Sequence, residues 1–254
     1  MKIVRFEIDN TISYGVLAAE NQIHVLSGDV FNNTFTETGK RLSLDNVTLL
    51  APCVPSKAVC IGLNYHDHAR EMNLTLPEEP LLFLKPSSAL NHPGGTIEYP
   101  AISKNLHYEG ELAIVIKKEA RKVPVETAFE YVFGYTCAND VTARDIQMKD
   151  SQWTRGKSFD TFLPLGPCIE TEFDPHNAAI RLLLNGEIKQ SSTTANLIFK
   201  VPEMVAFISQ VMTLYPGDVI LTGTPSGVGP MQVGDTVTVE IDGIGRLNNS
   251  IVSG

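Results

Sequence analysis

The sequence predicts an α+β fold dominated by a mixed sheet, and two observations support this class. Short apolar runs of strand character recur along the chain, and helical spacing of apolar residues is confined to three segments. Strands and helices therefore do not alternate as they do in a doubly wound α/β protein. The predicted strands span 58–61, 81–84, 111–116, 131–138, 180–184, 218–221 and 236–241, and the predicted helices span 65–72, 140–150 and 201–214.

Individual elements follow from local patterns. Met204, Val205 and Ile208 recur at helical spacing, and Pro202 lies where the first turn of a helix tolerates proline. Asn185-Gly186, between Arg-Leu-Leu-Leu and Glu-Ile-Lys-Gln, is typical of the tight turn of a β-hairpin.

The chain is expected to form one large domain with a small appendage. Its 254 residues, 43% of them hydrophobic, suffice for a sizeable core. Residues 1–50 have the pattern of short strands joined by turns and are interpreted as a small β-rich N-terminal extension. Pro52 and Pro55 mark a connector, and residues 51–254 form the main domain.

Composition excludes several classes of partner and compartment. Lys and Arg number 20 and Asp and Glu number 29, so the net charge is −9, which argues against nucleic acid and anionic lipid as partners. The first residues lack the apolar stretch of a secretory signal, and no apolar run approaches the ~20 residues of a membrane span. The four cysteines form no Cys-x-x-Cys pair and are interpreted as reduced thiols of a cytoplasmic protein.

Glu109-Gly110-Glu111 is the strongest chemical signal in the chain. Residues two apart on a strand point to the same face, and the apolar run Leu-Ala-Ile-Val-Ile that follows indicates a buried strand. Two neighbouring buried carboxylates repel each other, and a hard divalent cation such as Mg²⁺ or Mn²⁺ relieves that repulsion. The alternative is a solvated strand edge, where charged residues usually lie.

A second polar group follows at Asp140. If 140–150 is helical, Arg144 at i+4 and Gln147 at i+7 share one face with Asp140, and together they could hold a metal ion and an anionic substrate. The alternatives are a helix cap at Asp140 and a surface Asp–Arg pair.

Three further segments carry candidate residues. In a short helix over 65–72, Glu71 could orient His68 as a general base, although such pairs also occur on surfaces. Lys157 follows a glycine and could stabilise an oxyanion, or it could be an ordinary loop lysine. The glycine-rich run 222–229 lacks the end of a P-loop; it could offer backbone N–H groups to a carboxylate or form a simple turn.

Taken in order, these motifs resemble the fumarylacetoacetate hydrolase family. The matching segments are Gly-Leu-Asn-Tyr-His-Asp-His-Ala-Arg-Glu (62–71), Phe-Leu-Lys-Pro-Ser (83–87), His-Tyr-Glu-Gly-Glu-Leu (107–112), Asn-Asp-Val-Thr-Ala-Arg-Asp-Ile-Gln (139–147), Gly-Lys-Ser-Phe-Asp (156–160) and Ile-Leu-Thr-Gly-Thr-Pro-Ser-Gly-Val-Gly (220–229). The first 50 residues resemble the short N-terminal extension of some bacterial members.

The resemblance implies a mixed β-roll or barrel-like fold, a homodimer, and Mg²⁺ or Mn²⁺ in the site. It assigns the metal ligands to Glu109, Glu111 and Asp140, and the catalytic roles to His68, Glu71 and Lys157. It assigns substrate binding to Arg144, Gln147 and Thr224. Leu63 departs from the arginine that acylpyruvase-like members often carry, and the further Asp ligand of the longer hydrolases has no counterpart here.

The activity that the resemblance implies is metal-dependent chemistry on a small 2-oxo acid through an enolate that the metal ion stabilises. The first expectation is hydrolysis of a C–C bond, as in acylpyruvate hydrolases, or decarboxylation of an oxaloacetate-like acid. The alternative is a 2-hydroxyhepta-2,4-diene-1,7-dioate isomerase or 5-oxopent-3-ene-1,2,5-tricarboxylate decarboxylase of aromatic catabolism. A protein of another class, which binds metal and carboxylate without catalysis, is the third possibility.

Overall fold

The computed structural model describes residues 1–32 and 34–254, and its backbone is organised around three sheets. The largest has twelve strands, of which ten form a continuous path: β4 (Thr34–Ser43), β3 (Gln22–Asp29), β2 (Thr11–Leu17), β1 (Lys2–Ile8), β14 (Leu163–Glu170), β12 (Val132–Asn139), β11 (Gly110–Ile116), β17 (Val219–Leu221), β6 (Lys57–Gly62) and β7 (Leu81–Pro86). β5 (Thr48–Leu50) pairs with β1, and β8 (Leu90–Asn91) pairs with β14.

Two smaller sheets complete the strand framework. The five-stranded sheet has the order β16 (Glu187–Thr193), β15 (Ala179–Leu184), β19 (Thr236–Ile241), β20 (Gly245–Ser253) and β9 (Thr96–Tyr99). The three-stranded sheet consists of β13 (Thr142–Ala143), β10 (Leu106–Tyr108) and β18 (Gly229–Met231). Contacts of β15, β19 and β20 with β11, β12 and β14 bury the facing apolar side chains between the two larger sheets. This arrangement confirms the predicted α+β class and the mixed, roll-like architecture.

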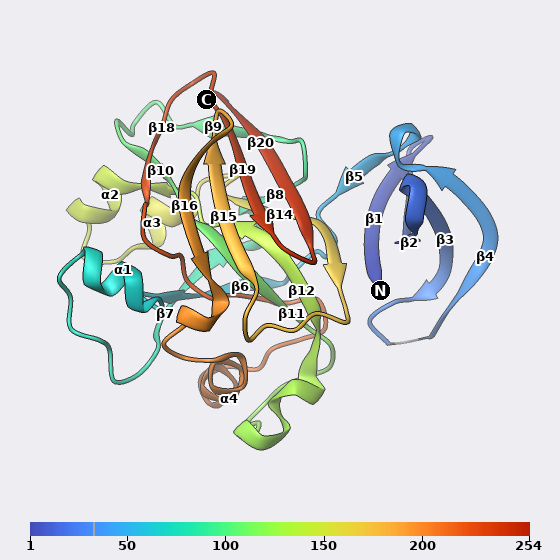
Figure 1. Cartoon of the computed structure of the whole chain (residues 1–254), viewed down its shortest axis with the longest axis horizontal. Helices are drawn as coiled ribbons and strands as arrows, with labels where there is room; N and C mark the ends of the chain where they lie inside the picture. The colour runs from blue at the N-terminus through green and yellow to red at the C-terminus, as the bar shows by residue number, and fades with distance from the viewer. Residues whose placement is uncertain (33) are drawn as a thin grey trace.

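The helices are short and lie around the sheets (Figure 1). The α-helices are α1 (His66–Glu71), α2 (Arg144–Lys149), α3 (Thr154–Lys157) and α4 (Val201–Val211). The 3-10 helices are η1 (Ala19–Asn21), η2 (Leu44–Asn46), η3 (Ser87–Ala89), η4 (Val125–Tyr131) and η5 (Thr194–Asn196). No helix within the described residues is long and apolar enough to cross a membrane.

The N-terminal strands lie together at one side of the molecule, away from the helices α1, α2 and α3 (Figure 1). β1 connects them to the rest of the chain by antiparallel pairing with β14, with Lys2 opposite Glu170 and Ile3 opposite Ile169. The predicted strand character of residues 1–50 is confirmed. The division of the chain at residue 50 stays a proposal, since the sheet runs without a break from β4 to β7.

The seven predicted strands correspond to β6, β7, β11, β12, β15, β17 and β19. Asn185-Gly186 forms the turn between β15 and β16, where Leu184 pairs with Glu187. α4 begins at Val201 as predicted and ends three residues early, because Met212 is extended and Leu214 pairs with Ala120 instead.

The predicted helix over 140–150 is wrong in its first turn. The Asp140 N–H donates to the Glu109 carbonyl oxygen, and Thr142 and Ala143 pair with β10. These backbone groups are satisfied by neighbouring strands, so the chain stays extended and α2 starts only at Arg144. Asp140, Arg144 and Gln147 therefore do not share one helical face.

Candidate metal centre and active site

The structure brings Glu109, Glu111 and Asp140 together. Glu111 lies on β11 and Asp140 directly follows β12, and the antiparallel pairing of Gly110 with Asn139 places the start of one strand beside the end of the other. One oxygen atom from each of the three carboxylates lies within 4.8 Å of the other two, and all three residues are buried. The solvated strand edge is therefore excluded for Glu109 and Glu111.

Gly110 lets the five-stranded sheet approach the site from behind. A Cβ atom there would lie 3.1 Å from Leu182 and 3.2 Å from the side-chain oxygen of Gln190. Gln190 instead accepts a hydrogen bond from the Gly110 N–H at 2.9 Å and donates to the Thr224 hydroxyl at 2.8 Å. The close approach thus fixes the loop that carries Thr224 against β11.

Lys157 is buried among the carboxylates, which excludes an ordinary loop lysine. Its Nζ atom lies 2.9 Å from Glu109 Oε2 and 2.6 Å from Asp140 Oδ2. Gly156 makes this position reachable, since a Cβ atom there would lie 2.9 Å from the Gln147 backbone nitrogen. Burial alone would lower the pKa of this ammonium group, but Asp140 and Glu109 raise it, so Lys157 stays charged.

A second buried lysine, Lys85, contacts both Asp140 and the backbone around the site. Its Nζ atom donates to the carbonyl oxygens of Val141, Lys157 and Phe162, at 3.0, 2.5 and 2.9 Å. It also lies 2.8 Å from Asp140 Oδ1. The sequence assigns no role to Lys85, although a lysine within the apolar run of β7 is a signal that could have drawn attention to it.

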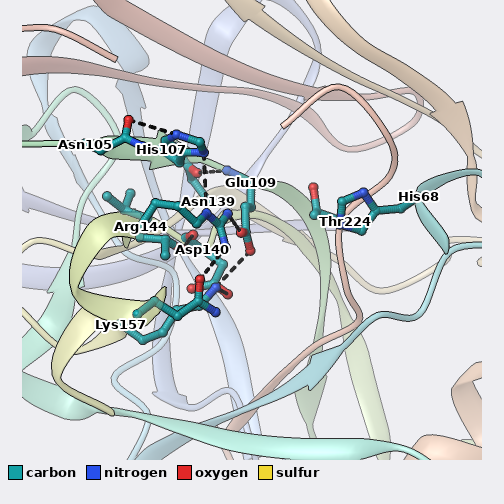
Figure 2. A network of polar contacts seen from close by, with 12 residues as sticks. His68, Asn105, His107, Glu109, Asn139, Asp140, Arg144, Lys157 and Thr224 are labelled. Carbon is teal, nitrogen blue, oxygen red and sulfur yellow. Dashed lines mark hydrogen bonds and ion pairs between the residues drawn. The ribbon is translucent and has the colours of Figure 1, made fainter. Parts of the chain in front are cut away.

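The remaining predicted polar residues lie around this centre (Figure 2). Arg144 contacts Glu109 and Gln147, and its Nε atom donates to His107 Nδ1 at 3.4 Å. His107 in turn contacts Asn105 at 3.0 Å, and its pKa is lowered to about 4 by burial and by Arg144. Neither His107 nor Asn105 is identified from the sequence, because only the fold places them beside Arg144.

His68 and Glu71 lie on α1, and Figure 2 shows His68 beside Thr224. His68 Nδ1 is 3.0 Å from Glu71 Oε2, and the same carboxylate accepts from the Gly227 N–H. No hydrogen bond to the other ring nitrogen of His68 occurs within residues 1–32 and 34–254. The Thr224 hydroxyl donates to the Gly110 carbonyl oxygen at 3.0 Å and accepts from Gln190, so it has little capacity left for a substrate.

One cavity connects these groups. It has a volume of about 260 Å³ and is lined by His68, the three carboxylates, Arg144, Gln147, Lys157 and Thr224, together with a set of apolar residues. A larger, open groove of about 690 Å³ runs nearby along residues 149–159, but its lining includes none of the predicted site residues.

The donor set fits a hard divalent cation. Asp140 Oδ1 receives no hydrogen bond from any residue that the structure describes, because the three N–H groups of Lys85 are directed at carbonyl oxygens. Burial, followed by the charges of Asp140 and Glu109, raises the pKa of Glu111 well above its usual range. Three buried carboxylates whose oxygen atoms converge on one point suit Mg²⁺ or Mn²⁺.

Comparison with known proteins identifies the family of this chain. Residues 57–252 match the family described as fumarylacetoacetate hydrolase C-terminal, and residues 1–52 match the Rv2993c-like N-terminal family. The chain therefore belongs to the fumarylacetoacetate hydrolase family.

Three relatives show the range of activities in this family. A 5-carboxymethyl-2-hydroxymuconate delta-isomerase structure from Mycobacterium smegmatis is 41% identical, with a TM-score of 0.94 and complete coverage of both chains. A maleylpyruvate hydrolase structure from Sphingobium sp. SYK-6, in complex with manganese(II) and pyruvate, is 31% identical, with a TM-score of 0.84 and complete coverage of both chains. The mitochondrial oxaloacetate tautomerase fahd2 of Xenopus laevis is 45% identical over 83% of this chain and 70% of its own.

Proposed function

We propose that this protein is a Mg²⁺- or Mn²⁺-dependent enzyme that cleaves a C–C bond of a small 2-oxo acid by hydrolysis or decarboxylation. The observation that carries the proposal is the convergence of Glu109, Glu111 and Asp140 with Lys157 and His68 on one cavity. The structure of the Sphingobium relative, with manganese and pyruvate bound, supports both the ion and the 2-oxo acid.

Formal charge favours an anionic substrate. Three carboxylates face Lys85, Lys157 and Arg144, so the protein groups balance at zero. A bound divalent ion raises the total to +2, and it supplies Lewis-acid stabilisation of negative charge that develops on a 2-oxo oxygen. Lys157 would stabilise the same developing charge from the protein side.

His68 is the proposed general base. Glu71 holds its Nδ1 side, so the opposite nitrogen can take a proton from water or from a carbon next to the oxo group. Lys157 and Arg144 would orient the acid while His68 acts from the side of Thr224 (Figure 2).

Isomerisation is the second candidate, and the relatives favour it specifically. The Mycobacterium smegmatis structure is described as an isomerase and the Xenopus relative as a tautomerase. Both reactions move a proton next to an oxo group, which the same His68 could do without water attack.

The test is a panel of acetylpyruvate, oxaloacetate and a 2-hydroxy-2,4-dienedioate, each with Mg²⁺, Mn²⁺ or chelator. Absorbance and CO₂ release separate hydrolysis, decarboxylation and isomerisation. Full activity in chelator would contradict the metal proposal. Stabilisation by oxalate and Mg²⁺ without any product would favour a non-catalytic binding protein.

His68→Ala should lower kcat for the preferred substrate by ~10²-fold or more while Mn²⁺ affinity stays near that of the wild type. His66→Ala is the matched control, since His66 is exposed on the same helix and does not line the cavity. Loss of Mn²⁺ binding in His68→Ala alone would make the histidine a ligand and contradict the assigned role.

A further inference from the structure

The cavity of the candidate site is divided by depth into two chemically different halves. Its floor consists of polar residues that are almost inaccessible, with Asp140 0%, Glu111 2% and Lys157 2% exposed. Its rim consists of apolar side chains that reach solvent, with Leu74 52% and Met148 79% exposed. A molecule bound with its acid group on the floor must therefore extend towards an apolar opening.

An aromatic wall joins the two halves. Phe83 and Trp153 pack edge to face with ring centroids 5.3 Å apart, and Lys157 Nζ lies 4.9 Å from the centre of the Phe83 ring. Gly62 makes room for the indole, because a Cβ atom there would lie 2.9 Å from Trp153. The wall thus begins directly beside the cation that contacts Glu109 and Asp140.

Apart from the partly exposed Arg144 and His68, the outer half of the cavity is lined by apolar side chains. The charged and titratable residues that line the cavity are His68, Arg144, Lys157 and the three carboxylates. The apolar lining residues include Leu63, Met72, Leu74, Phe83, Met148 and Trp153. Three of the five N–H groups of Arg144 are engaged by His107, Gln147 and Glu109. Lys149 and Arg155 line the neighbouring open groove instead.

We propose that the site selects 2-oxo acids whose carbon chain continues beyond the reacting carbons as an uncharged arm, packed against Phe83 and Trp153 and covered by Met72 and Leu74. This inference rests on the proposed function, because that function places the acid group on the floor. A four-carbon acid such as oxaloacetate would occupy the floor and leave the aromatic wall unused. Burying apolar surface favours the longer chain.

The experiment measures binding without turnover, by titrating the Mn²⁺-loaded protein with straight-chain 2-oxo acids from pyruvate to 2-oxohexanoate. Each added methylene should tighten binding about fourfold, which gives roughly 60-fold over the three methylenes. In addition, 2-oxopentanoate should bind more tightly than 2-oxoglutarate, whose arm ends in a carboxylate. Affinities that stay flat along the series, or a preference for 2-oxoglutarate, would overturn the inference.

Two variants locate the arm. Trp153→Ala should reduce the gain per methylene to less than twofold, whereas Ile102→Ala, at an exposed apolar residue outside the cavity, should keep it. Met148→Lys changes a residue that is 79% exposed, which leaves the fold intact, and should shift preference towards 2-oxoglutarate. An unchanged series in both cavity variants would place the arm elsewhere and contradict the proposal.

If the proposed function itself is wrong, the binding experiment gives a different result. If neither oxalate nor any 2-oxo acid binds the Mn²⁺-loaded protein, the proposed acid-binding site on the floor is wrong. The proposed binding of an uncharged arm is then refuted as well. A graded alkyl series without turnover of any substrate in the panel would keep the arm and overturn only the catalytic proposal.

Discussion

Replacing Lys157 by methionine tests the electrostatic balance of the site directly. The lysine is 2% exposed and neutralises Glu109 and Asp140, so Lys157→Met leaves two buried carboxylates without this partner. Removing one partner of a buried ion pair costs about 3–5 kcal/mol of the free energy of unfolding. For a chain of this size each kcal/mol lowers the melting temperature by ~2–4 °C, so the expected loss in EDTA is about 6–20 °C.

Mn²⁺ should restore much of that loss, because a divalent ion can neutralise the same carboxylates. At a metal concentration of about 100 times Kd, binding alone adds about 2.7 kcal/mol. Calorimetry of the variant and the wild type, in EDTA and in Mn²⁺, therefore measures both effects in one experiment.

The matched control is Lys118→Met, which removes an exposed lysine 3.4 Å from Glu130. It should change the melting temperature by no more than ~2 °C in either buffer. The reasoning is refuted if Lys157→Met melts with the wild type in EDTA, or if Mn²⁺ raises its melting temperature no more than that of Lys118→Met.

Two further changes probe the same centre. Because the pKa of Glu111 is raised, its proton stabilises the metal-free fold fully below the usual carboxyl pKa of ~4.3, and that stabilisation is lost as pH rises through the raised value. Mn²⁺ needs the ionised carboxylate, so Mn²⁺ should raise the melting temperature more at pH 8 than at pH 6. Glu111→Gln should remove most of this increase. An equal increase at both pH values in the wild type would contradict the reasoning. Lys85→Met removes the donor of three buried carbonyl oxygens, at about 1–3 kcal/mol each, and should lower the denaturation midpoint in urea. A midpoint equal to that of the wild type would contradict this role of Lys85.

The sequence by itself determined the class of the fold and seven of the strands that follow residue 50, whereas long strands such as β14 and β20 were not predicted. Apolar runs such as 112–116 are buried on both faces, and their short length and β-branched residues favour strands. Asn185-Gly186 specified a hairpin because its turn geometry is local. Order and spacing of the motifs also identified the family, which the comparisons confirm.

Local sequence patterns predicted the wrong backbone conformation where hydrogen bonds to a strand distant in the sequence determine it. Asp140–Ala143 has a helical pattern but is extended, because Glu109 and β10 satisfy its backbone. Helix propensity is a weak preference of a fraction of a kcal/mol per residue, and hydrogen bonds to neighbouring strands override it.

In the candidate site, too, some features follow from local sequence spacing and others only from the tertiary structure. The spacing of Glu109 and Glu111 placed two carboxylates on one face of a strand, since that distance is set by the strand itself. Only the tertiary structure decided that Lys157 lies between Glu109 and Asp140, that Lys85 supports them, and that Trp153 forms a wall beside them. These contacts join residues far apart in the chain, such as Lys85 and Phe162, which are 77 positions apart. The packing of separate strands and helices, rather than a local sequence rule, brings such residues together.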